Sequence, residues 1–510
     1  MQYYLKKAKK RKIPVTMATQ HPDHAAKPFW HASSFISTAH EAYEAFVCFS
    51  QLGIDEYKWD WEGKLVDEAV LERLVADHWQ YFKDHPLGKE KFLTFRLPNP
   101  KVQNEFRLGR ALMGILSAAG LAKQVGLYSP PLFEVILPMT ESEKEMLSIQ
   151  EAFREIASLK HPLYNFENGV LKHIEIIPLF EQVSTIIHSD KILTKYIDLH
   201  KIIFGFEPIY IRPYMARSDP ALNSGIVPTM MAIKIGLSKY KNLEKETGIK
   251  MYPVVGVGTL PFRGSINPTH INKFIQEYSG IRTTIVQSAF RYDFPKAQVK
   301  KAIKKLQVEL PKGKPQTVSE EEEHKIVQVI KIFEDPYRKS IEKLALLINK
   351  IASHVPKRRE RVLHIGLFGY SRGEGKVKLP RAITFTASLY SLGIPPEIIG
   401  TGRGLKKAMA DGSVKLIEKY YKNIRHDLTK ASRFVNKEGL QLLAKKNPVF
   451  KEILEDISGV EEYLGFALGP KTLDEQQHCL IISNIQQSLA KNKNITPLIE
   501  QAAILRHSMG

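Results

Sequence analysis

Short runs of apolar residues that stop at a charged or polar side chain recur along this chain. Most are rich in β-branched residues, and helical patterns separate them. Continuous apolar runs of this length are typical of parallel strands that are buried on both faces. The runs are Ile13–Thr19, Phe92–Phe95, Phe133–Leu137, His173–Phe180, Ile209–Ile211, Val254–Leu260, Thr284–Val286 and Val362–Phe368.

About eight such strands, alternating with helices, predict an α/β fold, an eight-stranded (β/α) TIM-like barrel with extra helices. The carboxyl ends of the strands meet at one face of such a barrel and carry its active site. Here they hold one histidine, a few carboxylates and many arginines, a set that suits a metal ion and a multiply charged anion. The polar residues after the runs are His21, Arg96, Thr140, Glu141, Glu181, Arg212, Arg217, Asp219, Arg263, Gln287, Arg291, Ser371 and Arg372.

After Arg381 the strand pattern fades and helical patterns replace it. We expect a helical carboxy-terminal layer packed on the barrel. No tract rich in Ser, Gly or Pro interrupts the chain, so we expect a single domain over 1–510, with 1–381 mainly barrel and inserted helices and 382–510 mainly helical. The expected helices of the layer are Ile383–Tyr390, Leu405–Phe434, Leu440–Leu464 and Leu473–Ala490.

Two earlier helices carry start signals of the capping-box type. Thr140–Glu143 precedes an amphipathic stretch with Met146 and Phe153 on one face, and Ser319–Glu322 precedes a second stretch. We expect both apolar faces to be core, and we expect each helix to begin at its capping box.

The net positive charge of the chain indicates that its ligands are anionic. There are 74 Lys and Arg against 54 Asp and Glu, a net charge of +20, which raises nucleic-acid binding as an alternative. The lysines are spread over helical segments, however, and no groove-reading motif accompanies them. Attraction of small anionic substrates is the simpler interpretation.

Location and solubility can also be predicted. No apolar run approaches the roughly 18 residues of a membrane span, and no apolar segment follows the lysine-rich start. The two cysteines, Cys48 and Cys479, lie far apart without metal-ligand spacing, as in a reducing compartment. We expect a soluble, cytoplasmic protein that does not bind a membrane.

Glu181 and Asp219 are the candidate metal ligands, because each follows a predicted strand and the two strands are consecutive. Two carboxylates with water and substrate oxygens satisfy the octahedral geometry of Mg²⁺. A carboxylate at a strand end is also often a helix cap or an arginine partner, so spacing alone leaves both interpretations open.

Four arginines at strand ends, Arg96, Arg263, Arg372 and Arg381, stand beside Pro, Gly or Ser. Guanidinium groups in such turns suit bidentate binding of phosphate and carboxylate. The glycine-rich run Gly369–Gly375 matches neither the P-loop nor the dinucleotide fingerprint, which disfavours ATP and NAD as ligands.

His21 follows the first strand and is a candidate for catalysis, although a lone histidine is more often structural. The segment Trp59–Lys64 is ambiguous: Asp60, Glu62 and Lys64 could reach the site or could form a capped turn with two core tryptophans. The capped turn is the favoured interpretation.

Three segments, Met17–Asp23, Lys58–Lys64 and Pro395–Arg403, resemble the archaeal-type phosphoenolpyruvate carboxylases, and the resemblance covers essentially the whole chain. It implies a lyase that irreversibly carboxylates phosphoenolpyruvate with bicarbonate to oxaloacetate and phosphate and so supplies C4 acids. It also implies Mg²⁺ or Mn²⁺ as cofactor and a homotetramer.

The resemblance also implies roles for individual residues. His21 would be catalytic, Glu181 and Asp219 would hold the metal, and Arg96 and Arg381 would bind the substrate's phosphate. Arg263 and Arg372 would bind substrate and take part in catalysis. The further candidates are Arg217, Arg403, Arg506 and Gly510.

The chain departs from the longer bacterial and plant enzymes of this kind at two positions. Leu222 stands where they have a lysine three residues after the metal-binding Asp, so the role of that cation must pass elsewhere, for which Arg217 is a candidate. Ser265–Pro268 lacks the second arginine of their glycine-rich loop. The chain is also far shorter, so their allosteric regulation is not implied.

Two rival functions remain open at this point. One is another metal-dependent barrel enzyme that uses phosphoenolpyruvate, such as a phosphotransferase to a nucleotide or to the protein itself. The other is a basic RNA-associated protein that keeps the barrel as a scaffold.

Overall fold

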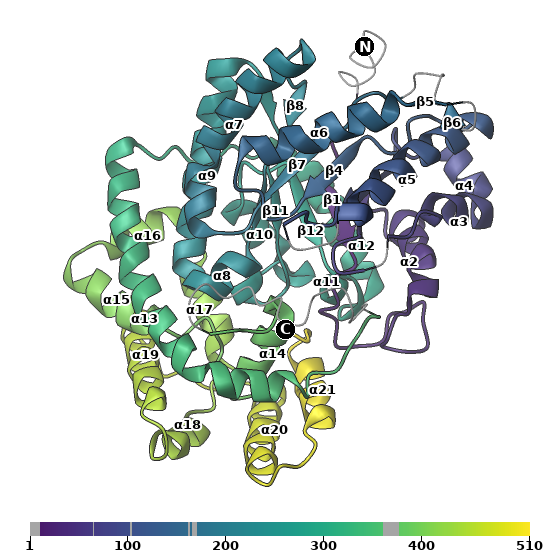
Figure 1. Cartoon of the computed structure of the whole chain (residues 1–510). Helices are drawn as coiled ribbons and strands as arrows, with labels where there is room; N and C mark the ends of the chain where they lie inside the picture. Colours follow the sequence, from purple (N-terminus) through teal and green to yellow (C-terminus); the bar gives the residue numbers. More distant parts are fainter. Residues whose placement is uncertain (1–10, 65, 102–104, 162–163, 166–170, 361–376) are drawn as a thin grey trace.

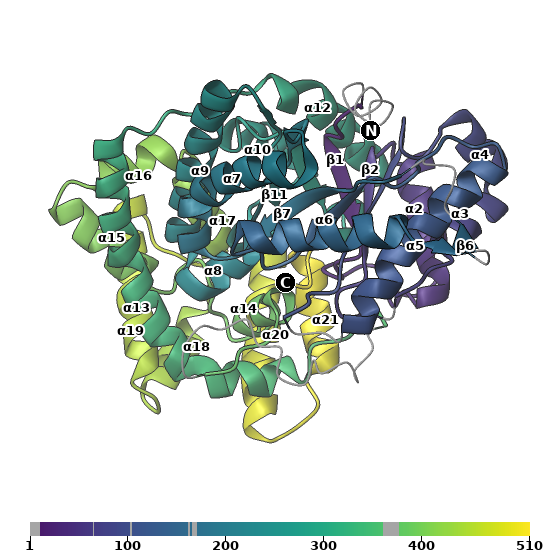
Figure 2. The same cartoon turned by 45° about the horizontal axis from the view of Figure 1, so that its top comes forward.

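The computed structural model describes residues 11–64, 66–101, 105–161, 164–165, 171–360 and 377–510. Its centre is a closed barrel of parallel strands in the order β1-β12-β11-β9-β7-β4-β3-β2, as Figures 1 and 2 show. The α/β barrel fold is therefore confirmed. Its strands are β1 (Thr16–Thr19), β2 (Glu56–Asp60), β3 (Phe92–Arg96), β4 (Glu134–Leu137), β7 (Glu175–Phe180), β9 (Tyr214–Ala216), β11 (Val254–Gly256) and β12 (Thr283–Val286).

Six of the eight apolar runs overlap with a barrel strand. The run Ile209–Ile211 does not: it contains β8 (Tyr210–Ile211), which pairs with β10 (Lys250–Met251) outside the barrel. The barrel strand β9 begins three residues after β8 ends. The run Val362–Phe368 lies outside the described residues. The closed ring is completed by β2, where the sequence predicted no strand.

Helices connect and cover the strands, and α8 and α11 start directly after strands β9 and β12. A further antiparallel pair is formed by β5 (Lys160–His161) and β6 (Tyr164–Asn165). The helices up to α13 are α2 (Thr38–Ser50), α3 (Val70–Asp77), α4 (Trp79–Asp84), α5 (Glu105–Gln124), α6 (Glu143–Ala157), α7 (Val183–Phe204), α8 (Ser218–Ser224), α9 (Ile226–Thr247), α10 (Ile271–Glu277), α11 (Ser288–Tyr292), α12 (Lys296–Glu309) and α13 (Glu320–Ala352). Short 3₁₀ turns are η1 (Pro261–Arg263), η2 (Pro268–His270) and η3 (Leu310–Lys312).

The described chain from Ala382 onward contains helices and no strands, which confirms the expected helical layer. Its helix α14 contacts α8, the helix that follows barrel strand β9 in sequence. Helix α15 packs against both α13 and α19 (Figures 1 and 2). The helices are α14 (Ala382–Tyr390), α15 (Thr401–Ala410), α16 (Val414–Tyr420), α17 (Ile424–Ser432), α18 (Lys437–Ala444), α19 (Val449–Leu464), α20 (Leu473–Ala490) and α21 (Thr496–Leu505). The expected helix Leu405–Phe434 is thus three helices.

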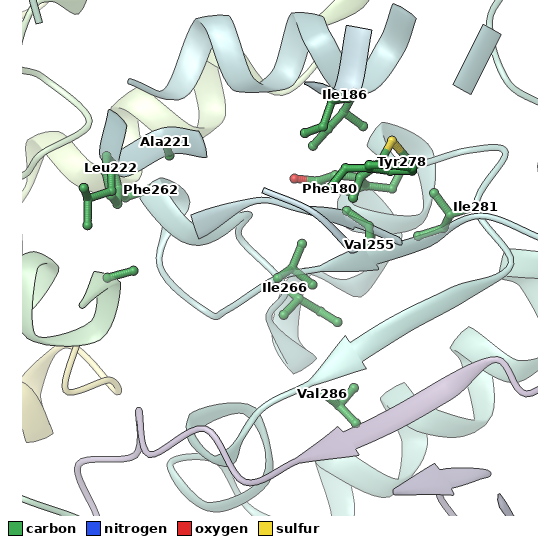
Figure 3. Packing of buried hydrophobic residues seen from close by; sticks show 14 of the residues in the cluster. Phe180, Ile186, Ala221, Leu222, Val255, Phe262, Ile266, Tyr278, Ile281 and Val286 are labelled. Atoms are coloured by element: carbon green, nitrogen blue, oxygen red, sulfur yellow. The ribbon is translucent and has the colours of Figure 1, made fainter. Parts of the chain in front are cut away.

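The two faces of the strands supply two separate cores. Leu179, Val254 and Ile285 belong to a small cluster inside the barrel. The residues after them in sequence, Phe180, Val255 and Val286, belong to the large core between the barrel and its helices (Figure 3). This alternation is what the pleat of a barrel strand imposes.

A buried ion cluster fills the amino-terminal end of the barrel. Arg212 donates to both carboxylate oxygens of Glu56, at 3.1 and 2.7 Å, and to Glu134 at 2.6 Å. Glu56 and Glu134 are the first residues of β2 and β4. Arg212 therefore lies at the end of the barrel opposite to the one that the sequence suggested, because the run before it is not a barrel strand.

Among the described residues, no helix combines the length and the apolar character that crossing a membrane requires.

Candidate active site

A cavity of about 420 Å³ opens at the carboxyl ends of the barrel strands. Its wall includes the last residues of several strands, among them Arg96 of β3, Ala216 of β9 and Gly256 of β11. The cavity brings together seven residues that the sequence singled out, from separate segments of the chain: His21, Arg96, Glu181, Asp219, Arg263, Gln287 and Arg381.

His21 lies two residues beyond β1 and is held by its backbone. Its carbonyl oxygen accepts a 2.6 Å hydrogen bond from the hydroxyl of Ser288, at the start of α11. Nε2 of the ring lies 3.5 Å from Nζ of Lys58, and Nδ1 makes no hydrogen bond within the described part of the chain. Burial, and next the positive charge of Lys58, lower the pKa of His21 well below its ordinary value. The imidazole is therefore neutral and able to accept a proton.

Arg96 is held in place by two carboxylates, that of Asp60 at the end of β2 and that of Glu62 two residues later. Its Nε donates to Oδ1 of Asp60 at 2.7 Å, and its Nη1 lies 2.6 Å from Oε2 of Glu62. Nζ of Lys58 lies 3.2 Å from the same Asp60 oxygen. Holding a guanidinium in this way fixes its orientation before any ligand binds.

The capped-turn interpretation of Trp59–Lys64 is therefore corrected in part: Trp59 and Asp60 end β2, and the turn lies at Glu62 and Gly63. Asp60 and Glu62 support the site through Arg96, and Lys64 donates to Gln20 at 3.1 Å and forms an ion pair with Glu41. The tryptophans are core residues as expected, and Trp61 stacks on Phe95.

Arg263, in η1, lines the cavity but already has several protein acceptors. Its Nη1 donates to Gly510 at 2.7 Å and Asp23 at 3.2 Å, its Nη2 to Gln287 at 2.6 Å, and its Nε to Ser218 at 3.1 Å. These contacts connect the ends of β1, β9, β11 and β12 to the end of the described chain. Arg263 therefore brings positive charge to the cavity and also organises its wall.

Glu181 directly follows β7, and Asp219 is the second residue of α8, which follows β9. The two strands are neighbours, with Phe180 opposite Met215. Tyr214 lies beside both carboxylates: burial raises the pKa of its hydroxyl, Arg96 opposes this rise, and Asp60, Glu181 and Asp219 add to it. Within the described residues, no group of three or more His, Cys, Asp and Glu is arranged to hold a metal.

These two carboxylates fit a hard cation that keeps coordination positions for water and ligand oxygens. Both line the same cavity as the arginines. A divalent cation there would leave its remaining positions to a ligand bound in that cavity.

The other candidates have different surroundings. Arg217 donates to the carbonyl oxygen of Phe262 at 3.1 Å and does not line the cavity. Arg403 forms an ion pair with Asp456 at 2.8 Å, among helices of the carboxy-terminal layer. Neither is brought to the cavity. Arg372 lies outside the described residues.

Arg506 and Gly510 lie near the cavity without opening into it. Arg506 lines a different cavity of about 320 Å³ and donates to the carbonyl oxygen of Met509 at 2.8 Å. Met509 lines the barrel cavity, and its backbone N–H donates to the carbonyl oxygen of Asp23 at 2.7 Å.

Sequence reasoning missed several cavity residues, of which Lys58 is the most informative. It is buried, and burial and the charge of Arg96 lower its pKa to about 8. The alternation of Glu56, Lys58 and Asp60 with aromatic residues could have revealed β2, since period-2 alternation is typical of a strand. Other missed residues are Tyr214, Lys357, Arg358 and Arg359.

Comparison with known proteins gives a consistent result. A family model described as phosphoenolpyruvate carboxylase matches residues 13–510. A phosphoenolpyruvate carboxylase of Leuconostoc mesenteroides is 40% identical over 503 residues, which cover 98% of this chain and 99% of the relative. Those of Metallosphaera sedula and Pyrococcus horikoshii are 37% and 39% identical, over 98% and 87% of this chain and 100% and 94% of theirs.

Proposed function

The chain belongs to the phosphoenolpyruvate carboxylase family, and on that premise we propose how its cavity carboxylates phosphoenolpyruvate with bicarbonate to give oxaloacetate and phosphate. The observation that carries the proposal is the meeting of His21, Arg96, Arg381, Glu181 and Asp219 around one cavity at the carboxyl ends of the strands. Family membership supports the reaction, and the geometry supports the assignment of roles.

The substrate is a phosphate ester and a carboxylate, and the cavity is rich in cations. Arg96 and Arg381 bind the phosphoryl group, and Arg263 adds its charge from the wall. Asp60 and Glu62 hold Arg96 in place, so little side-chain freedom is lost when the substrate binds. Arg372 is assigned to the anionic intermediates through the family resemblance alone.

Glu181 and Asp219 would hold Mg²⁺ or Mn²⁺, whose positive charge would oppose the negative charge of the phosphate and of the enol oxygen. The carboxylates themselves keep the cation on the side of the cavity formed by β7 and β9.

The reaction has two halves. A bicarbonate oxygen attacks the phosphorus, the bond from phosphorus to the enol oxygen breaks, and carboxyphosphate and the enolate of pyruvate result. His21 then removes the carboxyl proton of carboxyphosphate, which releases CO₂ and phosphate beside the enolate. The enolate carbon attacks CO₂ to form oxaloacetate. A neutral His21 is the form that this step needs, in agreement with its lowered pKa.

By the same family resemblance we extend the proposal to a cytoplasmic homotetramer that acts as a single domain per chain. Light scattering would then give about four times the chain mass of 58.1 kDa.

The proposal is tested by an oxaloacetate assay in CO₂-depleted buffer, with phosphoenolpyruvate and Mg²⁺, with and without added bicarbonate. We expect oxaloacetate and phosphate in equal amounts, and only when bicarbonate is present. Turnover that requires a nucleotide or a phosphorylated protein residue in place of bicarbonate would support the rival phosphotransferase. Nucleic-acid binding that weakens steeply with salt, without turnover, would support the RNA-associated protein.

A further inference from the structure

Lys58 lines the barrel cavity, yet the reaction described above assigns it no role. It is the third residue of β2, and its side chain is 1% exposed. The neighbours Tyr57 and Trp59 point into the outer core. The pleat therefore turns Lys58 inward, together with Glu56 and Asp60.

The ammonium group of Lys58 has two polar contacts within the described part of the chain. Its Nζ lies 3.2 Å from Oδ1 of Asp60 and 3.5 Å from Nε2 of His21. Asp60 is shared, because Arg96 donates to the same oxygen at 2.7 Å. An ammonium group has three N–H bonds, so one remains for a ligand in the cavity that Lys58 lines.

A buried lysine is costly unless it is paired, and its charge is then usually satisfied by a carboxylate of its own. Lys234 is such a case: it lies outside the cavity, at 2.7 Å from Glu277. Lys58 instead shares one carboxylate with Arg96 and faces a neutral imidazole.

The proposed reaction brings bicarbonate, an anion, next to His21, and a cation there would stabilise its negative charge. The proton that His21 removes is on the carboxyl group that comes from bicarbonate, so that group must lie within hydrogen-bond reach of the ring. Leu222, at the position where the longer enzymes have a lysine, is buried in the core (Figure 3), and Arg217 donates to backbone carbonyls. Neither can serve.

We propose that Lys58 is the cation that binds bicarbonate and the carboxyl group of carboxyphosphate beside His21. Asp60 then holds two cations with different ligands: Lys58 binds the carboxyl group, and Arg96 binds the phosphoryl group. This inference rests on the proposed function and adds a binding residue to it. The lowered pKa of about 8 still leaves the ammonium mostly charged at neutral pH.

The test compares Lys58→Gln, which removes the charge but keeps a donor for Asp60, with Lys58→Arg, which keeps the charge in a different shape. Losing a charged hydrogen bond predicts that Lys58→Gln raises the KM for bicarbonate about ten- to a hundredfold. Lys58→Arg should raise it about three- to tenfold, because a guanidinium fork does not replace a point ammonium. The KM for phosphoenolpyruvate should stay within about threefold for both.

Lys234→Gln is the matched control, since it removes another buried lysine with a carboxylate partner. It should lower the melting temperature without changing the KM for bicarbonate. If Lys58→Gln does not fold, the KM for bicarbonate of Lys58→Arg alone tests the inference. A bicarbonate KM within twofold of wild type in the folded Lys58 variant overturns the inference, and so does a larger rise in the KM for phosphoenolpyruvate than for bicarbonate. Failure of wild type to make oxaloacetate from bicarbonate would instead overturn the proposed function itself.

Discussion

Nη1 of Arg263 donates a 2.7 Å hydrogen bond to the carbonyl oxygen of Gly510, which lies 247 residues further along the chain. A Cβ atom on Gly510 would lie 2.0 Å from the carbonyl oxygen of Ile383 and 2.8 Å from the backbone nitrogen of Ala387. Only glycine fits at this position without displacing α14, whose N-cap is Arg381.

Gly510→Ala should therefore disturb both Arg263 and Arg381. We expect kcat/KM for phosphoenolpyruvate to fall at least about tenfold, which corresponds to the loss of one charged hydrogen bond. Removing Gly510 should likewise impair catalysis more than folding. Steady-state kinetics and a thermal melt measure the two effects. Full activity in either variant would show that the Arg263 contact has no part in the reaction.

Arg96→Lys should weaken the use of phosphoenolpyruvate although the charge is kept. A lysine cannot contact Asp60 and Glu62 and still offer a bidentate fork to phosphate. We expect kcat/KM to fall about ten- to a hundredfold, and the same for Arg381→Lys. Arg403→Lys, which alters an arginine paired with Asp456 outside the cavity, serves as the control and should affect stability alone. Kinetics within twofold of wild type would make the tested cavity arginine structural.

Asp219→Asn and Glu181→Gln should raise the concentration of Mg²⁺ needed for half-maximal activity by at least about tenfold, because ligand charge is what holds a hard cation against water. Chelation should abolish the activity of wild type, and Mg²⁺ or Mn²⁺ should restore it. Asp198→Asn, an exposed carboxylate on α7, is the control. An unchanged Mg²⁺ titration would remove the substituted residue from the metal site.

The sequence was most informative about the barrel, because strands buried on both faces leave a continuous apolar signature. It failed at β2, where Glu56, Lys58 and Asp60 face the barrel interior, so that no apolar run exists. For this reason the favoured turn at Trp59–Lys64 was wrong at its first two residues, which end β2, whereas a turn does follow at Glu62 and Gly63. An inward-facing polar strand is recognisable by alternation, but alternation does not tell which face is inside the barrel.

Local signals were less reliable where tertiary contacts compete with them. The capping box at Ser319–Glu322 is confirmed at the start of α13. The one at Thr140–Glu143 was wrong: the hydroxyl of Thr140 donates to Leu137, and α6 begins only at Glu143. The partner of Arg403, Asp456, lies 53 residues away in sequence, so no local pattern could show that this arginine is satisfied outside the cavity.

Glu397 predicts a pH dependence of stability. Its Oε1 accepts from the N–H of Phe262 at 2.7 Å and from the hydroxyl of Tyr390 at 2.9 Å, and burial raises its pKa from 4.5 to about 7. Between these values the folded state binds more protons than the unfolded state, so this group makes stability fall as pH rises from about 4.5 to about 7.

Glu397→Gln keeps the acceptor but cannot ionise. Relative to wild type, its free energy of unfolding should therefore rise by on the order of 1–3 kcal/mol between pH 5 and pH 8. Urea unfolding at the two pH values measures the difference. A gap between the two proteins that does not change with pH would show that Glu397 is already ionised in the folded state at pH 5.

The central claim is that His21 acts after phosphoryl transfer, and the products of His21→Asn test it most directly. The arginines and the metal carboxylates remain in this variant, so bicarbonate should still attack the phosphorus. Carboxyphosphate would then hydrolyse or escape, and the enolate would be protonated to pyruvate. Phosphate, pyruvate and oxaloacetate are measured together, with and without bicarbonate. The account predicts bicarbonate-dependent release of phosphate and pyruvate with little oxaloacetate, whereas a ratio of oxaloacetate to phosphate equal to that of wild type would contradict it.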